Sequence, residues 1–104
     1  MSLNSRDVNE RIERIKNAVE QRERCRAKHV QSVRVKEKWI EGTAWDGVVE
    51  TFDLLDHPAA KRAYAWERWE PGEEPRYTII LGVPPVNSAN DALKAAIMSV
   101  LKKL

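Results

Sequence analysis

Several residue types that mark a catalytic or ligand site are scarce in this sequence. Cys25 is the only cysteine, so no internal disulfide can form, and a reducing, cytoplasmic location is expected. His29 follows four residues later, but two ligands fall short of the four that a structural zinc site needs. The four glycines are too scattered for a loop that cradles phosphate. The sequence therefore predicts neither a metal site nor a cofactor.

Long apolar runs are lacking as well. No stretch is long enough to span a bilayer, and no apolar run follows a basic start near the N-terminus. Neither a membrane segment nor a secretory signal is therefore expected. The 104 residues, of which 33% are charged, fit a single soluble domain covering residues 1–104.

Charge is unevenly divided along the chain, although the net charge is only +2. Residues 1–38 carry eleven basic against six acidic side chains, residues 39–86 carry four against nine, and residues 87–104 carry three against one. Such a dipolar chain suits head-to-tail self-association or an acidic protein partner. A basic first helix that is simply solvated explains the same distribution.

An amphipathic helix is predicted over about residues 4–27. Val8, Ile12, Ile15 and Val19 recur every three or four residues and form one narrow apolar stripe. A stripe this narrow is typical of a coiled-coil seam. These four residues are therefore the candidate interface of a homodimer.

Four strands and a second helix are predicted after the first helix. Segments rich in β-branched or alternating residues place the strands at about residues 29–40, 45–55, 62–70 and 76–83. Ser88 and Asp91 form a serine-x-x-acid capping pattern that opens a helix over about residues 88–103. Short turns between consecutive strands favour an antiparallel meander. The expected fold is a two-layer α+β domain in the order α-β-β-β(β)-α, with both helices on one face of the sheet.

This order of elements, with the final helix "ALKAAIMSVLKKL", resembles a double-stranded-RNA-binding domain in outline. The resemblance covers most of the chain and implies RNA as a partner. Domains of that family grip phosphates with lysines that open the last helix. Here the same place reads "NSAND" and holds no cation, so no site residue is carried over from the family.

The segment "AKRAYAWERWE", residues 60–70, carries the main binding hypothesis. Every second residue from Arg62 to Arg68 shares one face of a strand, and this face bears two aromatic rings between two cations. Beside basic residues of the first strand, such a face suits base stacking and phosphate contacts. The candidate binding residues are Arg34, Lys36, Lys38, Arg62, Tyr64, Trp66 and Arg68.

The same alternation also fits a core strand or an oligomer interface. The opposite parity of the third strand offers two alanines, Glu67 and Trp69, which bury little apolar area in so small a domain. This comparison favours a buried Tyr64 and Trp66.

His57, next to Asp56, is the only candidate for catalysis, because an aspartate can orient an imidazole for general-base chemistry. A turn-capping pair is the simpler interpretation. The acidic residues between positions 41 and 56 are expected to form a solvated face.

Together these patterns predict a small, non-catalytic binding or interaction module that self-associates, with a homodimer as the expected form. A nucleic-acid-binding domain that uses the basic first helix and first strand is the alternative. A small enzyme that uses His57 is the third hypothesis.

Overall fold

A computed structural model describes residues 5–39, 42–69 and 71–102, with side chains for 8–37, 45–69 and 71–99. The expected α+β class, element order and antiparallel meander are confirmed. Residues 4, 40, 70 and 103 of the predicted ranges lie outside the described residues. The elements are α1 (Ser5–Glu23), β1 (Arg26–Trp39), β2 (Gly42–Leu55), β3 (Arg62–Arg68), β4 (Arg76–Leu81) and α2 (Ala89–Lys102).

The first helix ends four residues earlier than predicted. It stops at Glu23, and Arg24 has a φ of 53°, the left-handed conformation that commonly closes a helix. β1 starts at Arg26 and pairs there with Leu55 of β2. Ala27 is buried in the sheet, so packing outweighs the helix propensity that continues to residue 28.

The second helix starts as its capping pattern predicts. The Ser88 Oγ accepts a hydrogen bond from the backbone N–H of Asp91 at 3.1 Å. The Asp91 carboxylate in turn accepts one from the backbone N–H of Asn87, also at 3.1 Å. Two of the amides at this end therefore have partners.

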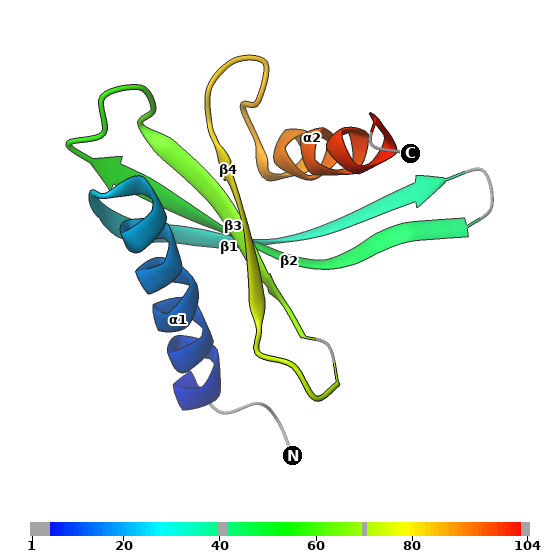
Figure 1. Cartoon of the computed structure of the whole chain (residues 1–104), viewed down its shortest axis with the longest axis horizontal. Helices are drawn as coiled ribbons and strands as arrows, with labels where there is room; N and C mark the ends of the chain where they lie inside the picture. The colour runs from blue at the N-terminus through cyan, green and yellow to red at the C-terminus, as the bar shows by residue number, and fades with distance from the viewer. Residues whose placement is uncertain (1–4, 40–41, 70, 103–104) are drawn as a thin grey trace.

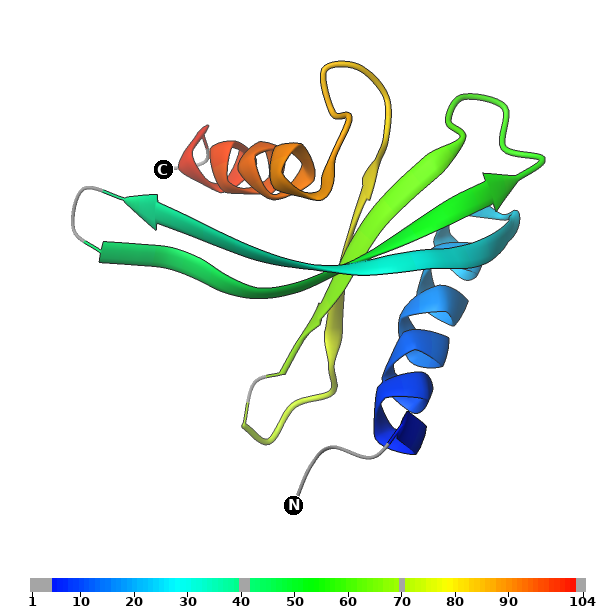
Figure 2. The same cartoon turned by 180° about the vertical axis from the view of Figure 1, so that it is seen from behind.

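The expectation that both helices cover one face of the sheet is wrong. Ile15 and Val19 of α1 pack in a core cluster with Ala63 and Ala65 of β3. Leu93 of α2 packs in a second cluster with the β3 side chains of the other parity. Because successive side chains of a strand point to opposite faces, the two helices lie on opposite faces. Figures 1 and 2 show α1 and α2 well apart from each other, on different sides of the crossing strands of the twisted sheet.

Side-chain sizes on β3 explain why both faces are covered. Ala63 and Ala65 are fully buried under the larger Ile15 and Val19 of α1. Tyr64 and Trp66, which are 3% and 7% exposed, lie under α2, where Ala89 and Ala92 leave room for the rings. Large side chains thus meet small ones on each face, as close packing requires. A strand covered on both sides needs apolar residues at consecutive positions, and residues 63–66 supply them.

The hairpin of β1 and β2 extends beyond the rest of the sheet. β1 and β2 each have 14 residues, whereas β3 has 7 and β4 has 6. Figure 1 shows the far half of this hairpin reaching to one side, with α2 above it. The strand order β1-β2-β3-β4 leaves β1 and β4 as the two edges. β4 is nearest the viewer in Figure 1 and β1 in Figure 2. No helix within the described ranges is long and apolar enough to cross a membrane.

Candidate functional site

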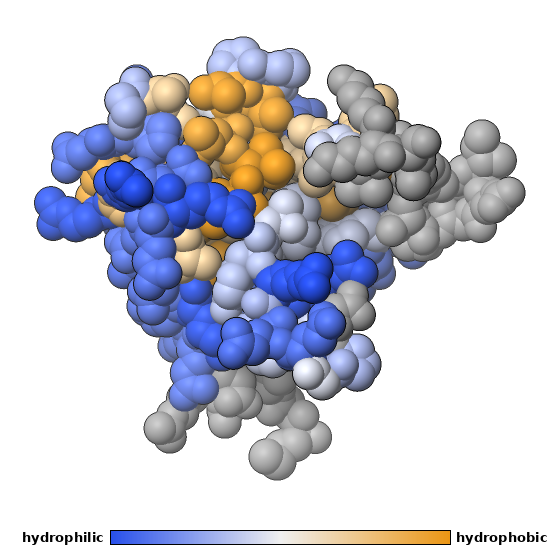
Figure 3. All heavy atoms as spheres, viewed as in Figure 1, coloured by the Kyte–Doolittle hydropathy of each residue, from blue (hydrophilic) through white to orange (hydrophobic). Residues whose placement is uncertain are grey.

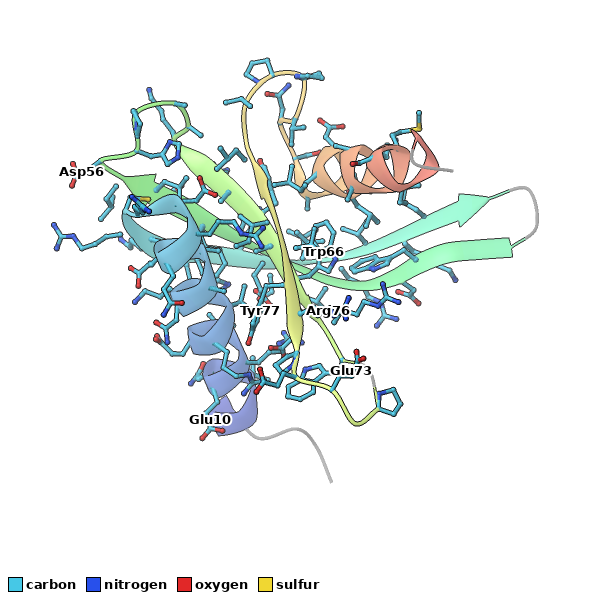
Figure 4. All side chains as sticks on the ribbon, in the orientation of Figure 1. Glu10, Asp56, Trp66, Glu73, Arg76 and Tyr77 are labelled. Carbon is cyan, nitrogen blue, oxygen red and sulfur yellow. The ribbon has the colours of Figure 1, made fainter. Side chains whose placement is uncertain are left out.

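The structure does not bring the seven candidate binding residues onto one open face. Tyr64 and Trp66 are core residues beneath α2, and Figure 4 shows Trp66 enclosed between β4 and α2. Arg62 is half-buried and donates to the Asp53 carboxylate at 3.2 Å, while Arg68 is exposed at the end of β3. The aromatic stacking platform is therefore absent from this part of the sheet.

Arg34 and Lys36 of β1 lie on the other face from those rings. Val33 and Val35 belong to the cluster under α2, so Arg34 and Lys36 point to the opposite side, where both are exposed. Arg34 also forms a surface ion pair with Asp46 at 3.2 Å. Lys38 lies in β1, but its side chain is outside the described residues. Nucleic-acid binding by these residues stays a prediction, but Tyr64 and Trp66 are buried and cannot contribute base stacking to it.

The apolar stripe of α1 is largely used within the chain. Ile15 and Val19 are fully buried in the protein's own core, and Ile12 packs against it. Val8 is half-buried near the start of the helix. The predicted homodimer stays a prediction, but most of its proposed coiled-coil seam is already covered by the sheet.

His57 is held as a turn cap. Its Nδ1 accepts hydrogen bonds from the backbone N–H groups of Ala59 and Ala60 at 3.0 and 2.9 Å. Its Nε2 lies 3.1 Å from the Glu23 Oε1. Because Nδ1 accepts, the proton is on Nε2, and both ring nitrogens are engaged. Asp56 is exposed and points away from the molecule in Figure 4, so it does not orient this ring.

Cys25 is half-buried against the α1 core cluster. Burial raises the pKa of its thiol, and the nearby charges of Glu23, Glu20 and Asp56 raise it further, so the thiol stays protonated at neutral pH. Within the described residues, no group of three or more histidine, cysteine or acidic side chains is placed to hold a metal ion.

Glu50 is the residue that the sequence pattern misplaced. It was expected on a solvated acidic face, yet it is fully buried on β2. Its carboxylate accepts from Arg11 of α1 at 2.8 Å, from the His29 Nε2 of β1 at 2.8 Å, and from the Ser32 hydroxyl of β1. The three partners come from 18 to 39 residues away, so no local pattern predicts the network. Ser32 and His29 both contact the same carboxylate oxygen rather than each other, so the group is not a nucleophile-base pair.

A second polar cluster joins α1 to the β3–β4 hairpin. Arg14 makes two hydrogen bonds to Glu67, at 2.9 and 3.3 Å, and its guanidinium lies 5.7 Å from the ring centroid of the exposed Trp69. Burial alone would raise the pKa of Glu67, but hydrogen bonds from Arg14, Trp69 and Tyr77 lower it overall. The pKa of Tyr77 is raised, first by burial and then by the charge of Glu67. Arginine, tryptophan and tyrosine are the residue types that most often anchor protein interfaces.

The outer edge of β4 lies next to this cluster, because Glu67 is paired with Tyr77 of β4. The backbone N–H of Gly82 donates to the carbonyl of Arg62 at 2.7 Å, so alternate residues of β4 bond to β3. The N–H and C=O groups of Tyr77, Ile79 and Leu81 consequently turn outward, and β3 is the only strand paired with β4 in the described part of the chain.

The side chains along this edge are apolar. Ile79 and Leu81 are half-buried and Val83 is exposed, and Figure 3 shows hydrophobic colour gathered over the upper part of β4. From Tyr77 to Val83 the strand and its continuation contain no charged residue and no proline. This is the composition that promotes pairing with another strand.

The opposite edge is protected against such pairing. The outward-facing positions of β1 include Arg34 and Lys36, and the register shifts between His29 and Gln31, which marks a β-bulge. Charged side chains and bulges are the usual means of blocking an edge strand. Of the two edges, only β4 is therefore open to another chain.

Comparisons with known proteins add no assignment to this geometry: no family model, no curated protein and no solved structure matches the chain.

Proposed function

We propose that the protein is a small, non-catalytic interaction module that self-associates edge to edge through β4. The observation that carries this proposal is the contrast between the apolar, uncharged edge of β4 and the charged, bulged edge of β1. Strand addition to an exposed sheet edge is a common recognition mode.

A second copy of the chain is the partner that fits this edge. Two β4 strands related by a twofold axis run antiparallel, and a pairing centred on Ile79 sets Tyr77 opposite Leu81 of the other copy. The three outward-facing residues of each strand then make about six main-chain hydrogen bonds. No like charges face each other between Tyr77 and Leu81, because that part of the strand has none. The cluster of Arg14, Glu67 and Trp69 adjoins this strand, because Glu67 is paired with Tyr77 of β4.

Amide hydrogen exchange tests the proposal on the unmodified protein. The amides of Ile79 and Leu81 should become protected as the protein concentration rises and should exchange rapidly on dilution. The amides of Thr78 and Ile80 bond to β3 and serve as controls that stay protected throughout. Exchange of Ile79 and Leu81 that is rapid and independent of concentration would overturn the proposal.

A matched pair of proline variants tests whether the protein dimerises through β4, with the molar mass in solution as the measurement. Ile79→Pro removes an outward-facing N–H from β4, and Arg34→Pro removes an outward-facing N–H from β1. Light scattering should find a dimer for the wild type and for Arg34→Pro, and a monomer for Ile79→Pro, with matching circular dichroism as the check on folding. A dimer in all three proteins would place the interface elsewhere. A salt-sensitive shift of labelled RNA or DNA by monomeric protein would instead support the nucleic-acid alternative.

A further inference from the structure

A hollow of about 420 Å³ lies between α2 and the face of the sheet that α2 covers. Three strands and the helix contribute to its lining, which includes Trp45 of β2, Trp66 of β3, Thr78 of β4, and Leu93 and Ile97 of α2. Figure 1 shows α2 extending from β4 over the far half of the β1–β2 hairpin. Cavities of about 300–1,000 Å³ with a mostly apolar lining are typical of small-molecule sites. The hollow therefore has the size of a ligand site.

Two tryptophan rings form one wall of this hollow. The rings of Trp45 and Trp66 are 5.6 Å apart between centroids and tilted by 59°. The Trp45 ring lies directly on β2, because an added Cβ on Gly47 would be 2.8 Å from its Cη2. Trp66 is 7% exposed and belongs to the core cluster under α2. Because the fold holds both rings, this wall is formed before a ligand arrives, which lowers the cost of binding.

The tilt between the two rings favours a flat aromatic ligand. Aromatic rings attract one another in offset-stacked or edge-to-face arrangements, with centroids about 4.5–7 Å apart. A ring that lies parallel to one indole is inclined by 59° to the other, so it can stack on the first and approach the second with its edge. Leu93 and Ile97 of α2 provide aliphatic surface in the same hollow. An aliphatic chain would fill the space but would gain no ring-to-ring contact.

The charges around the hollow favour a neutral ligand. Among the described residues that line it, Arg68 alone is charged, and Arg68 already has an interaction partner within the protein. No acidic side chain is part of this described lining. An ion that moves from water into such surroundings without a partner is strongly disfavoured. Thr78 adds a single hydroxyl.

We propose that the hollow binds a small, neutral aromatic compound that stacks on the tryptophan pair of Trp45 and Trp66. An apolar cavity of about 150 Å³ holds one benzene ring, so a hollow of about 420 Å³ has room for two or three rings. The site lies on the α2 face of the sheet and does not use the outer edge of β4. It is therefore independent of self-association.

The test uses N-phenyl-1-naphthylamine, a neutral three-ring probe whose fluorescence rises in apolar surroundings. Titrated against the full chain, the probe should bind saturably at one site per chain. 8-Anilinonaphthalene-1-sulfonate has the same rings and an added sulfonate, and it should bind at least tenfold more weakly. Fluorescence that never saturates, or tighter binding of the sulfonate, would overturn the proposal.

Matched variants locate the bound probe. Ala96 lines the hollow, whereas its neighbour Ala95 lines a different depression of the surface. We expect Ala96→Leu to weaken binding at least tenfold and Ala95→Leu to change it less than twofold, with circular dichroism as the check on folding. If Ala96→Leu disturbs the fold, Trp45→Leu and Trp69→Leu repeat the comparison, since Trp69 is exposed and lies outside the hollow. Equal losses in the two members of a folded pair would place the probe elsewhere and refute the proposal.

Competition separates an aromatic occupant from an aliphatic one. 1-Naphthol and 1-decanol have the same number of carbons and one hydroxyl each, but only naphthol is aromatic. We expect 1-naphthol to displace the probe at concentrations at least tenfold lower than 1-decanol requires. Displacement by 1-decanol at equal or lower concentrations would assign the hollow to an aliphatic chain and contradict the proposal.

Discussion

Arg11→Met should destabilise the protein more than Glu50→Met, although the two residues share one ion pair. The Glu50 carboxylate is fully buried, whereas the side chains of Arg11 and His29 are 34% and 28% exposed. Removing Arg11 takes a permanent cation away from the buried carboxylate, which keeps its hydrogen bonds to His29 and Ser32. Removing Glu50 leaves partners that reach water.

The magnitudes follow from this asymmetry. Loss of one partner from a fully buried pair costs about 3–5 kcal/mol. Because Arg11 is one-third exposed, solvent screening reduces the expected cost of Arg11→Met to about 2–3 kcal/mol. Glu50→Met replaces the buried charge with apolar volume and should cost about 0–1 kcal/mol. The double variant should resemble Glu50→Met, since no buried charge remains to be compensated.

Urea unfolding followed by tryptophan fluorescence measures these differences. A loss of about 2 kcal/mol lowers the midpoint by roughly 1–2 M for a chain of this size. Arg22→Met, an exposed change on the same helix, is the control and should stay within about 0.5 kcal/mol of the wild type. If Glu50→Met proves as costly as Arg11→Met, the buried carboxylate contributes net stability of its own and the reasoning fails.

Three other substitutions test separate contacts. Glu67→Gln should cost about 1 kcal/mol at pH 7. The pKa of Glu67 is lowered in the fold, so its contribution to stability is fully present above the ordinary value of 4.5 and is lost as the pH falls through the lower, folded-state value. The urea midpoints of the two proteins should therefore move together as the pH falls below 4.5. His57→Ala leaves two turn amides without their acceptor and should lower stability by about 1–2 kcal/mol in the same assay. Gly47→Ala should displace the Trp45 ring, which would change the near-ultraviolet circular dichroism and cost about 0.5–1.5 kcal/mol of ring contact.

Each of these three has a result that would contradict it. A stability gap for Glu67→Gln that stays constant down to pH 3 would mean that the charge of Glu67 is not what stabilises the fold. Unchanged stability of His57→Ala would show that water replaces the imidazole at no cost. An unchanged aromatic spectrum of Gly47→Ala would mean that the ring does not lie over that glycine.

The sequence predicted the order of elements because their signals are local. The alternation in β4, the capping pattern at Ser88 and the helical stripe of α1 each depend on residues a few positions apart. The side of the sheet on which each helix lies depends on contacts between distant segments. Ala63 and Ala65 appeared too small to belong to a core, yet their size is what admits α1. The hypothesis of one buried face was therefore too narrow, because both faces of β3 are covered.

The candidate sites were harder to predict for the same reason. Glu50 lies among residues that alternate like any solvated strand, and its burial is permitted by Arg11, which is 39 residues away. Pairing between β2 and β3 ends at Glu50 and Ala65 although β3 continues to Arg68, and no single residue signals where it ends. Of these features, only the apolar, uncharged composition of β4 is visible in the sequence. That composition favours pairing with another chain only because β4 lies at an edge of the sheet.

The alternation of small and large side chains along β3 also fixes the register of the strand in the sheet. If β3 slipped by one residue against its neighbours, Tyr64 and Trp66 would turn toward Ile15 and Val19, and the alanines would lie in the space that the rings fill under α2. One face would be overfilled and the other left with cavities, each at a cost of several kcal/mol. Packing against both helices is therefore compatible with only one register of β3. A strand with four consecutive apolar residues would otherwise be among the easiest to misalign.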